Sequence, residues 1–431
     1  MLTITKSVPS AGSYDVVVCG GGPSGWVAAT AAARAGCRTA VIERFGFFGG
    51  TATAGLVVPV SGFFKNGTRV VGGIPWEFIG QMEKNGAAVL EMPKGHISVD
   101  TEYYKLIAQR IVVASGVDIF MNSYISYVIE NNGHVSAVII ENKGGSEAVE
   151  GRVFVDATGD GDVLWMAGAD MDICRQPQPL SLCFELIGLD CTTPLLKDSI
   201  HHDGRSGHSV NTQINRFLEK EYRLGTCPMF GGPWFNTLVK GDRIAVNITR
   251  SPATVLDNRE YAQAEFQLRE DMFALTEILR EHYPEFHGCT IASSAVNAGV
   301  RESRHLKGRY TITGQELLSG KDFPDSIARN AHPVDIHGNE AAGQILKDSD
   351  KSGHIPYRAL ISPKLDNVIA GGRMLSADAD AHASIRVQGT VMAVGQAAGT
   401  AAAICARENV SVGEIHIGRL RETLMHSRAI C

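Results

Sequence analysis

The chain has 431 residues, of which 44% are hydrophobic and 20% are charged, a balance that excludes a disordered, collagen-like or coiled-coil chain. At roughly 100–200 residues per domain, the length predicts two or three domains. The net charge of −6 argues against a nucleic-acid partner, and nine cysteines without C-x-x-C spacing indicate reduced thiols and a cytoplasmic location.

The first predicted elements form a β-α-β unit. Residues 14–19 are an apolar, β-branched run typical of a buried parallel strand. Residues 23–35 are rich in alanine and predict a helix, and residues 38–43 predict the second strand. Residues 1–13 lack an apolar core, so we expect no signal peptide.

The turn between this strand and helix carries a dinucleotide-binding pattern. Gly20, Gly22 and Gly25 have the spacing G-x-G-x-x-G. The three glycines permit a tight turn, close approach of a pyrophosphate and packing of the helix on the strand. Glu43 ends the second strand, where a carboxylate binds ribose hydroxyls and disfavours a 2′-phosphate. The pattern therefore predicts an adenine dinucleotide without that phosphate.

The next elements continue an α/β arrangement. A glycine-rich loop covers residues 45–55, and residues 100–114 predict a helix. Residues 117–141 predict strands joined by a hairpin turn at Asn132-Gly133. Residues 153–156 predict another buried strand that ends in a glycine-rich turn.

The middle of the chain changes character. Residues 182–189 and 243–250 alternate as antiparallel strands do, and residues 257–283 predict a long amphipathic helix. A last strand over 367–370 and a helix over 388–407 return to the first pattern. We expect one α/β domain interrupted by an insertion. The expected segments are 1–175 and 301–431 for the first domain and 176–300 for the inserted one.

The final helix is long enough to span a bilayer. Residues 387–406 carry no charge. They consist mainly of glycine, alanine and threonine, so their hydropathy is marginal. We expect a buried helix and no membrane partner.

Short motifs stand in order along nearly the whole chain. They are residues 20–25, Glu43, Phe48-Gly49-Gly50-Thr51, Asp156-Ala157-Thr158-Gly159-Asp160, residues 299–304, Asp335-Ile336-His337, Ile355-Pro356-Tyr357-Arg358, Gly372-Arg373, Arg386-Val387 and residues 395–399. With these motifs the chain resembles the FAD-dependent oxidoreductase family, which is related to fumarate-reductase and succinate-dehydrogenase flavoproteins. The resemblance implies an α/β fold, with a Rossmann-like FAD-binding domain of the glutathione-reductase type. An α+β substrate domain with an antiparallel sheet is expected to be inserted in it.

The resemblance also implies where FAD binds. The start of the last helix is expected under the flavin, where a helix N-terminus stabilises the negative charge of the reduced ring. Residues 45–55 contain no His or Cys, so we expect FAD to be non-covalent. The cofactor-binding residues expected are Gly20, Gly22, Pro23, Ser24, Gly25, Glu43, Arg44, Gly49, Gly50, Thr51, Ile125, Ala157, Thr158, Gly159, Gly372, Arg373, Gln388, Gly389 and Thr390.

Four residues are catalytic candidates. Arg386 lies where fumarate-reductase-type enzymes place an arginine that grips a carboxylate, although it could instead pair with a nearby acid. His382 could accept a hydroxyl proton. His337, oriented by Asp335, and Tyr357 are further candidates, with interdomain hydrogen bonding as the competing interpretation. We expect no metal site, because the histidines lack ligand spacing.

The favoured reaction is hydride transfer between flavin N5 and a C–H beside a hydroxyl or amine of a small polar substrate, such as a sugar or hydroxy acid. One alternative is reduction of an activated C=C bond. An alternative of another class is an FAD-binding subunit in RNA modification or assembly, against which the negative net charge argues. A second dinucleotide fingerprint is absent, so we expect a separate electron donor or acceptor. A homo-oligomer is left open.

Overall fold

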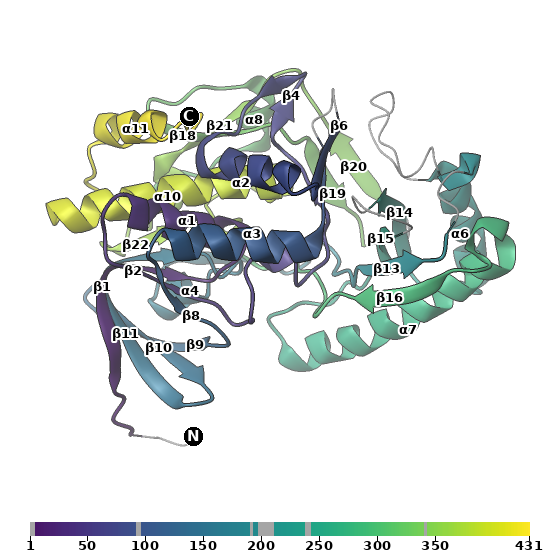
Figure 1. The fold of residues 1–431 in the computed structure, drawn as a ribbon, viewed down its shortest axis with the longest axis horizontal. Helices are drawn as coiled ribbons and strands as arrows, with labels where there is room; N and C mark the ends of the chain where they lie inside the picture. Colours follow the sequence, from purple (N-terminus) through teal and green to yellow (C-terminus); the bar gives the residue numbers. More distant parts are fainter. Residues whose placement is uncertain (1–4, 92–95, 190–192, 197–210, 238–242, 340–342) are drawn as a thin grey trace.

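A seven-stranded sheet lies at the centre of the larger lobe (Figure 1). The computed structural model describes residues 5–91, 96–189, 193–196, 211–237, 243–339 and 343–431. The strands follow the order β8-β2-β1-β11-β10-β9, and β22 pairs with the end of β11. Their bounds are β1 (Ser10–Cys19), β2 (Thr39–Ile42), β8 (Asp118–Phe120), β9 (Tyr124–Asn131), β10 (His134–Asn142), β11 (Gly145–Asp156) and β22 (Val368–Ala370).

The predicted β-α-β unit is confirmed. β1 and β2 are parallel, and helix α1 (Pro23–Arg34) connects them. β11 pairs in parallel with the other side of β1. The chain that leaves β1 continues to β2 on one side, whereas β11 lies on the opposite side, so the strand order changes direction at β1. Ligands of open α/β sheets bind at such a switch point, beyond the carboxyl ends of the strands.

The hairpin prediction is also confirmed. β9 and β10 are antiparallel, and Asn132 and Gly133 between them both have positive φ, 53° and 85°. Two consecutive left-handed residues form the turn whose twist matches that of the strands. This hairpin extends the sheet beyond the first half of β11.

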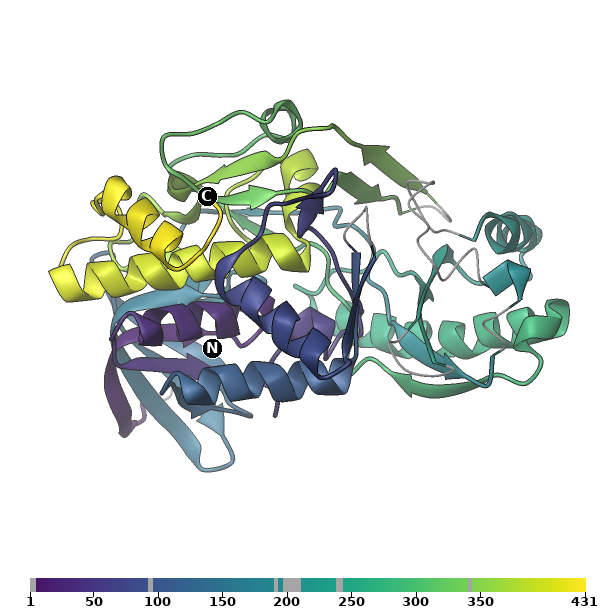
Figure 2. The same ribbon diagram turned by 45° about the horizontal axis from the view of Figure 1, so that its top comes forward.

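Helices α1 and α10 (Gln388–Glu408) pack backbone to backbone over the sheet. A Cβ added to Gly395 would lie 2.2 Å from the Ser24 carbonyl oxygen, and one added to Gly399 would lie 2.1 Å from that of Ala28. The small residues of the last helix therefore serve close packing. Figure 2 shows α10 lying along α1, with α3 (Thr101–Ala114) on the far side of α1.

α10 is the one helix of the described part of the chain that is long and apolar enough to cross a membrane. Within its most apolar window, 94% of the residues are buried in the protein. Such burial is that of a core helix.

A second hydrophobic core lies in the smaller lobe. β13 (Phe184–Ile187), β14 (Phe230–Thr237), β15 (Ile244–Thr249) and β16 (Thr290–Ser294) form an antiparallel sheet in the order β14-β15-β13-β16. Helix α7 (Asn258–His282) packs Leu268, Leu275 and Leu279 into this core, and α6 (Thr212–Leu224) lies beside β14. The antiparallel strands and the long helix agree with the sequence analysis, while the domain boundaries stay predictions.

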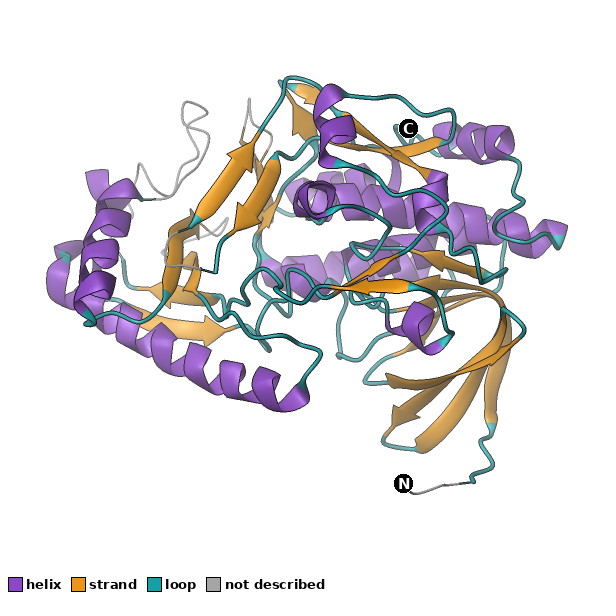
Figure 3. Cartoon of the chain, turned by 180° about the vertical axis from the view of Figure 1, so that it is seen from behind, coloured by secondary structure: helices purple, strands orange, loops and turns teal. Residues whose placement is uncertain are grey.

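Smaller elements connect the two lobes, as the view from behind in Figure 3 shows. Helix α2 (Gly73–Lys84) escaped sequence analysis because it begins in a Gly-Gly-Ile-Pro run that is typical of a loop. The remaining bounds are η1 (Gly50–Ala52), β3 (Pro59–Val60), β4 (Phe64–Lys65), β5 (Thr68–Arg69), β6 (Ala88–Glu91), β7 (His96–Val99), α4 (Asp162–Met166), β12 (Met171–Ile173), η2 (Pro284–Phe286), β17 (Arg304–Leu306), α8 (Gly314–Ser319), β18 (Ser326–Asn330), β19 (Val334–His337), β20 (Gln344–Lys347), β21 (Gly353–Pro356), η3 (Tyr357–Leu360), α9 (Ala379–Ile385) and α11 (Ile417–His426).

Candidate active site

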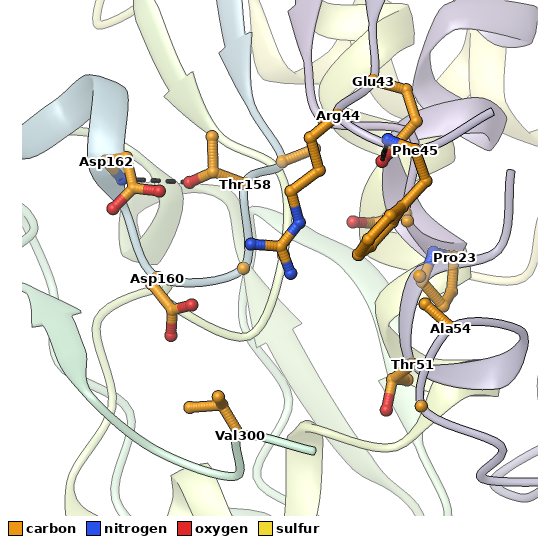
Figure 4. A pocket seen from close by; sticks show the side chains of 18 of the residues that line it. Pro23, Glu43, Arg44, Phe45, Thr51, Ala54, Thr158, Asp160, Asp162 and Val300 are labelled. Atoms are coloured by element: carbon orange, nitrogen blue, oxygen red, sulfur yellow. Dashed lines mark hydrogen bonds between the residues drawn. The ribbon is translucent and has the colours of Figure 1, made fainter. Parts of the chain in front are cut away.

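A cleft opens at the carboxyl ends of β1, β2 and β11 (Figure 4). Most of the residues predicted to bind the cofactor line it: Gly20, Gly22, Pro23, Ser24, Glu43, Arg44, Gly50, Thr51, Ile125, Ala157, Thr158, Gly159, Gly372 and Arg373. The structure thus brings six separate segments of the chain to one cavity.

A different constraint favours glycine at each of the three positions of the first motif. A Cβ at Gly25 would lie 1.8 Å from the Gly20 carbonyl oxygen, so Gly25 lets α1 pack on the turn. Gly20 has φ 103° and touches the Ala157 carbonyl. Gly22 has an ordinary φ of −64°, and a Cβ there would meet no described atom within 4 Å. Neither conformation nor packing requires this glycine, so the space that it leaves is available to a ligand in the cleft.

Glu43 is held at the floor of the cleft by backbone donors. Its carboxylate accepts the N–H of Gly21 at 2.6 Å and that of Phe45 at 2.8 Å. Burial raises the pKa of Glu43, and these two hydrogen bonds oppose the rise. In Figure 4 the Arg44 side chain projects into the cleft from the end of the same strand. Burial raises the pKa of Asp162, and the positive charge of Arg44 opposes the rise.

The turn after β11 forms the opposite wall. Asp156 accepts the Thr158 N–H and hydroxyl and the Leu164 N–H, which fixes the turn. Complete burial raises the pKa of Asp156 to about 6 against these bonds. Asp160 pairs with Arg373 at 2.8 Å. Sequence analysis did not assign Asp160 to the cofactor site, although it stands in one of the quoted motifs.

Five expected cofactor residues do not line this cleft. Gly25 and Gly49 support its walls, and Gly49 donates its N–H to the Gly21 carbonyl. The others begin α10 and face the 57–63 segment and β18 rather than the cavity. Gln388 donates to the Val57 carbonyl, Gly389 to the Ser61 carbonyl, and Thr390 to Asn330. Arg386, the C-cap of α9, and Val391 of α10 line the cleft instead.

Arg386 lines the cleft and lies close to two further arginines, Arg250 and Arg301. It donates to the Asp335 carbonyl at 2.9 Å and to Gln178 at 3.2 Å, not to Asp378 or Asp380. Arg250 and Arg301 both donate to the Ser181 hydroxyl. Burial lowers the pKa of all three guanidinium groups, and that of Arg250 falls to about 10. One buried and two half-buried guanidinium groups beside the carboxylates of Asp335 and Glu302 form a site suited to an anion.

Arg250 had no signal in the sequence beyond its position at the end of a predicted strand. Its guanidinium lies 5.0 Å from the centre of the Trp234 ring and directly over Gly231. Its Nη2 is buried and has no hydrogen-bond partner among the described residues. A donor with this burial and no acceptor leaves a hydrogen bond for a ligand to make.

Asp335 and His337 have the geometry of an oriented base. The Asp335 carboxylate lies 3.2 Å from His337 Nε2, and the edge of the Trp234 ring packs against the imidazole. Burial and then the charge of Arg301 lower the pKa of His337, so the ring is neutral at pH 7. With Nε2–H donated to Asp335, Nδ1 carries the lone pair, and it has no partner in the described part of the chain.

The other two catalytic candidates lie elsewhere. His382 is 1% exposed and stacks on His305 behind the cleft wall, with ring centres 4.1 Å apart. Tyr357 is buried in the main core, where its hydroxyl donates to the Val412 carbonyl at 2.9 Å. Of the four candidates only Arg386 lines the cleft, and the side chains of His337, His382 and Tyr357 do not. The catalytic roles expected for them stay predictions.

The cleft fits FAD by its own features. The room at Gly22 adjoins the N-terminus of α1, whose N-cap makes no side-chain hydrogen bond, and such a terminus binds phosphate. Glu43 offers carboxylate oxygens to ribose hydroxyls, and Ile125 belongs to the lining near the same end.

Comparison with known proteins agrees with this geometry. The structure resembles that of a geranylgeranyl bacteriochlorophyll reductase-like protein from Thermoplasma acidophilum, with a TM-score of 0.50 and 15% identity over 97% of this chain and 84% of that one. A myxobacterial chondrochloren halogenase, described as FAD-dependent, matches with a TM-score of 0.48 and 14% identity over 97% and 80% of the two chains. At these identities the likeness shows the fold alone.

A curated relative matches over a short stretch. Dihydrolipoyl dehydrogenase from Trypanosoma brucei brucei is 56% identical over 46 residues, which is 11% of this chain and 10% of that enzyme. A family model described as FAD dependent oxidoreductase matches residues 15–424. The chain therefore belongs to the FAD-dependent oxidoreductase family and is a flavoenzyme whose cofactor is FAD.

Proposed function

We propose that this enzyme exchanges a hydride between FAD and a small substrate that carries a carboxylate, with a 2-hydroxy acid as the favoured class. The observation that carries the proposal is the group of Arg250, Arg301 and Arg386, with an unpaired donor on Arg250. A neutral sugar would not compensate the positive charge of these three arginines. The cluster thus favours a hydroxy acid among the substrates that the sequence left open.

The cofactor is proposed to be non-covalent and to lie extended, as in flavoproteins of the glutathione-reductase type. Gly22 and α1 would hold the pyrophosphate, Glu43 the ribose, and Gly372 with Arg373 the ribityl chain. FAD, when bound, supplies an acceptor for a hydride, which carries both electrons of the oxidation.

The residues around the arginines can manage the proton. In oxidation of a hydroxy acid, the C–H electron pair leaves with the hydride and the hydroxyl proton must be accepted elsewhere. His337 Nδ1 is the group proposed to take it, with Asp335 holding the ring by Nε2. An anion bound to Arg301 would screen the charge that lowers the pKa of His337, so substrate binding would strengthen this base.

Reduction of a C=C bond conjugated to a carboxylate is the second candidate, as in the fumarate-reductase flavoproteins that the motifs resemble. The same arginines favour it, because they would hold the carboxylate in either direction. The two candidates differ in which redox form of the flavin the substrate consumes.

The test is an anaerobic absorbance scan of the purified yellow protein with 2-hydroxy acids, neutral polyols of equal size, and amines. Bleaching by a hydroxy acid and not by its polyol counterpart is expected. If reduced enzyme is instead reoxidised by enoates, the second candidate is correct. Bleaching by neutral polyols alone would contradict the anionic substrate. A separate electron acceptor and a cytoplasmic location complete the proposal.

A further inference from the structure

Three buried side chains outside the cleft form a second cluster. They are Glu302, His305 on β17 and His382 on α9, with exposed fractions of 6%, 8% and 1%. The cluster lies behind the Asp160–Arg373 wall, since Arg373 acts electrostatically on both histidines. The proposed hydride transfer uses none of these three groups.

Their ligand atoms converge on one point. Glu302 Oε1 lies 3.4 Å from His305 Nε2 and 3.9 Å from His382 Nδ1. One nitrogen or oxygen from each side chain lies within 4.8 Å of the others. Metal–ligand bonds of about 2.0–2.2 Å bring tetrahedral ligands to roughly 3.3–3.6 Å from each other. From separations of up to 4.8 Å, the cluster therefore needs to contract by up to about 1.2–1.5 Å, and the stacked His305 and His382 rings must turn, to coordinate an ion of this size.

Both nitrogens that face the carboxylate lack a partner. His305 Nε2 and His382 Nδ1 are buried and have no hydrogen bond to any described residue. The other side of the His305 ring makes a hydrogen bond to the backbone of Ala377, which places the ring proton on Nδ1. The lone pair of Nε2 then faces a carboxylate oxygen. Two electron-rich atoms in this arrangement repel unless a proton or a metal cation lies between them.

The surroundings resemble the support of a metal site. A metal-binding histidine commonly donates its second nitrogen to a backbone carbonyl, as His305 does toward Ala377. Glu302 is held by the Gln178 N–H at 3.3 Å and by the Cys174 thiol. The guanidinium groups of Arg386 and Arg373 both act on His382, and that of Arg373 is paired with Asp160.

We propose that Glu302, His305 and His382 bind one divalent transition-metal ion. Two imidazole nitrogens and one carboxylate oxygen are a donor set for Zn²⁺, Co²⁺ or Fe²⁺ rather than for Ca²⁺ or Mg²⁺. The ion would tie β17 to α9 immediately behind the cofactor cleft. This site adjoins the proposed substrate site, since the Arg386 charge acts on Glu302 and His382 and Gln178 bonds both Glu302 and Arg386.

The test uses the purified full chain with its FAD, dialysed against a chelator and titrated calorimetrically with Zn²⁺ and, separately, Co²⁺. About one ion per chain and a higher melting temperature are expected for the wild type. His305→Gln should weaken binding by about 10–100-fold or more, since it removes a ligand. His354→Gln is the control, because His354 bonds Ser326 and Asp322 away from the cluster and should leave binding unchanged.

Two results would overturn the site. One is a wild-type protein that takes up no stoichiometric metal after reloading. The other is His305→Gln that binds as tightly as the wild type. If His305→Gln does not fold, Glu302→Gln is titrated in its place and the wild-type stoichiometry decides alone. Substrate bleaching is measured on the same samples, so failure of the metal site and of the proposed reaction are distinguishable.

Discussion

Arg250 and Arg301 donate to the same acceptor, the hydroxyl of Ser181. Burial lowers the pKa of Arg301, and the charges of Arg250 and Arg386 lower it further. Two like charges held together by the fold are unfavourable for stability. A bound carboxylate would relieve their repulsion, which is why we assign them to substrate rather than to structure.

The first prediction concerns this pair. Arg250→Met should keep FAD and weaken binding of small dicarboxylates such as malonate by about 10–100-fold, because one charged hydrogen bond is lost. Binding is measured by the rise in melting temperature with ligand concentration. Arg243→Met is the control, since Arg243 is exposed and lies 3.7 Å from Glu185. Equal malonate binding by Arg250→Met and the wild type would remove Arg250 from the site.

The second prediction concerns Gly22. Gly22→Val should give folded but colourless protein, because its side chain would occupy only the cleft. We expect FAD affinity to fall by at least about a hundredfold, while the melting temperature of the FAD-free protein changes little. Gly80→Ala serves as the control, since a Cβ at Gly80 also meets no described atom within 4 Å but lies on α2. A yellow Gly22→Val protein would contradict the assignment of the pyrophosphate site.

The third prediction concerns pH. Because the folded-state pKa of His337 lies below 6.5, the neutral base persists at lower pH than for a free imidazole, and the acid limb of kcat/KM should lie below pH 6.5. Asp335→Asn removes a charge and a hydrogen bond that raise this pKa, so the limb should move to still lower pH. His337→Gln should abolish the limb and lower kcat by about 10²–10⁴-fold. A limb that is the same in all three proteins would exclude His337 as the base.

The lowered pKa of His337 also predicts how the free energy of unfolding changes with pH. The unfolded chain binds a proton to this imidazole near pH 6.5, and the folded chain binds it only at lower pH. The unfolded state therefore holds more protons in that window. The contribution of His337 to the free energy of unfolding is present above pH 6.5 and is lost as the pH falls below it. The melting temperature should accordingly fall less on acidification in His337→Gln than in the wild type.

The fourth prediction concerns the contact of α1 with α10. Gly399→Val should destabilise the fold by about 3 kcal/mol or more, because its Cβ would lie 2.1 Å from the Ala28 carbonyl oxygen and the backbone cannot yield locally. Denaturant unfolding measures the change, with Gly80→Ala again as the control. A loss below about 1 kcal/mol would mean that the two helices can separate without cost.

The sequence predicted the elements whose pattern is local. The apolar run of β1, the Asn132-Gly133 turn and the spacing of leucines on α7 each depend on neighbours in the chain, so their structure followed from residue type. The glycine spacing and Glu43 predicted an adenine dinucleotide because they lie in one contiguous β-α-β unit, and the resemblance carried by the other motifs implied FAD. Helix α2 was missed because its cap comes from Gln396, more than three hundred residues away in the chain.

The tertiary structure decided which distant side chains meet. Arg250 and Arg301 come from the smaller lobe and its border, and Arg386 from the return of the chain. No local pattern relates them, since their burial and repulsion exist only after folding. The same folding placed Tyr357 in the core and His382 beside His305. Residue type and spacing thus predicted the parallel β-α-β unit and a dinucleotide site, and the resemblance of the motifs implied the family and FAD. The anion site and the buried Glu-His-His cluster required the fold, because long-range packing sets the distances between charges.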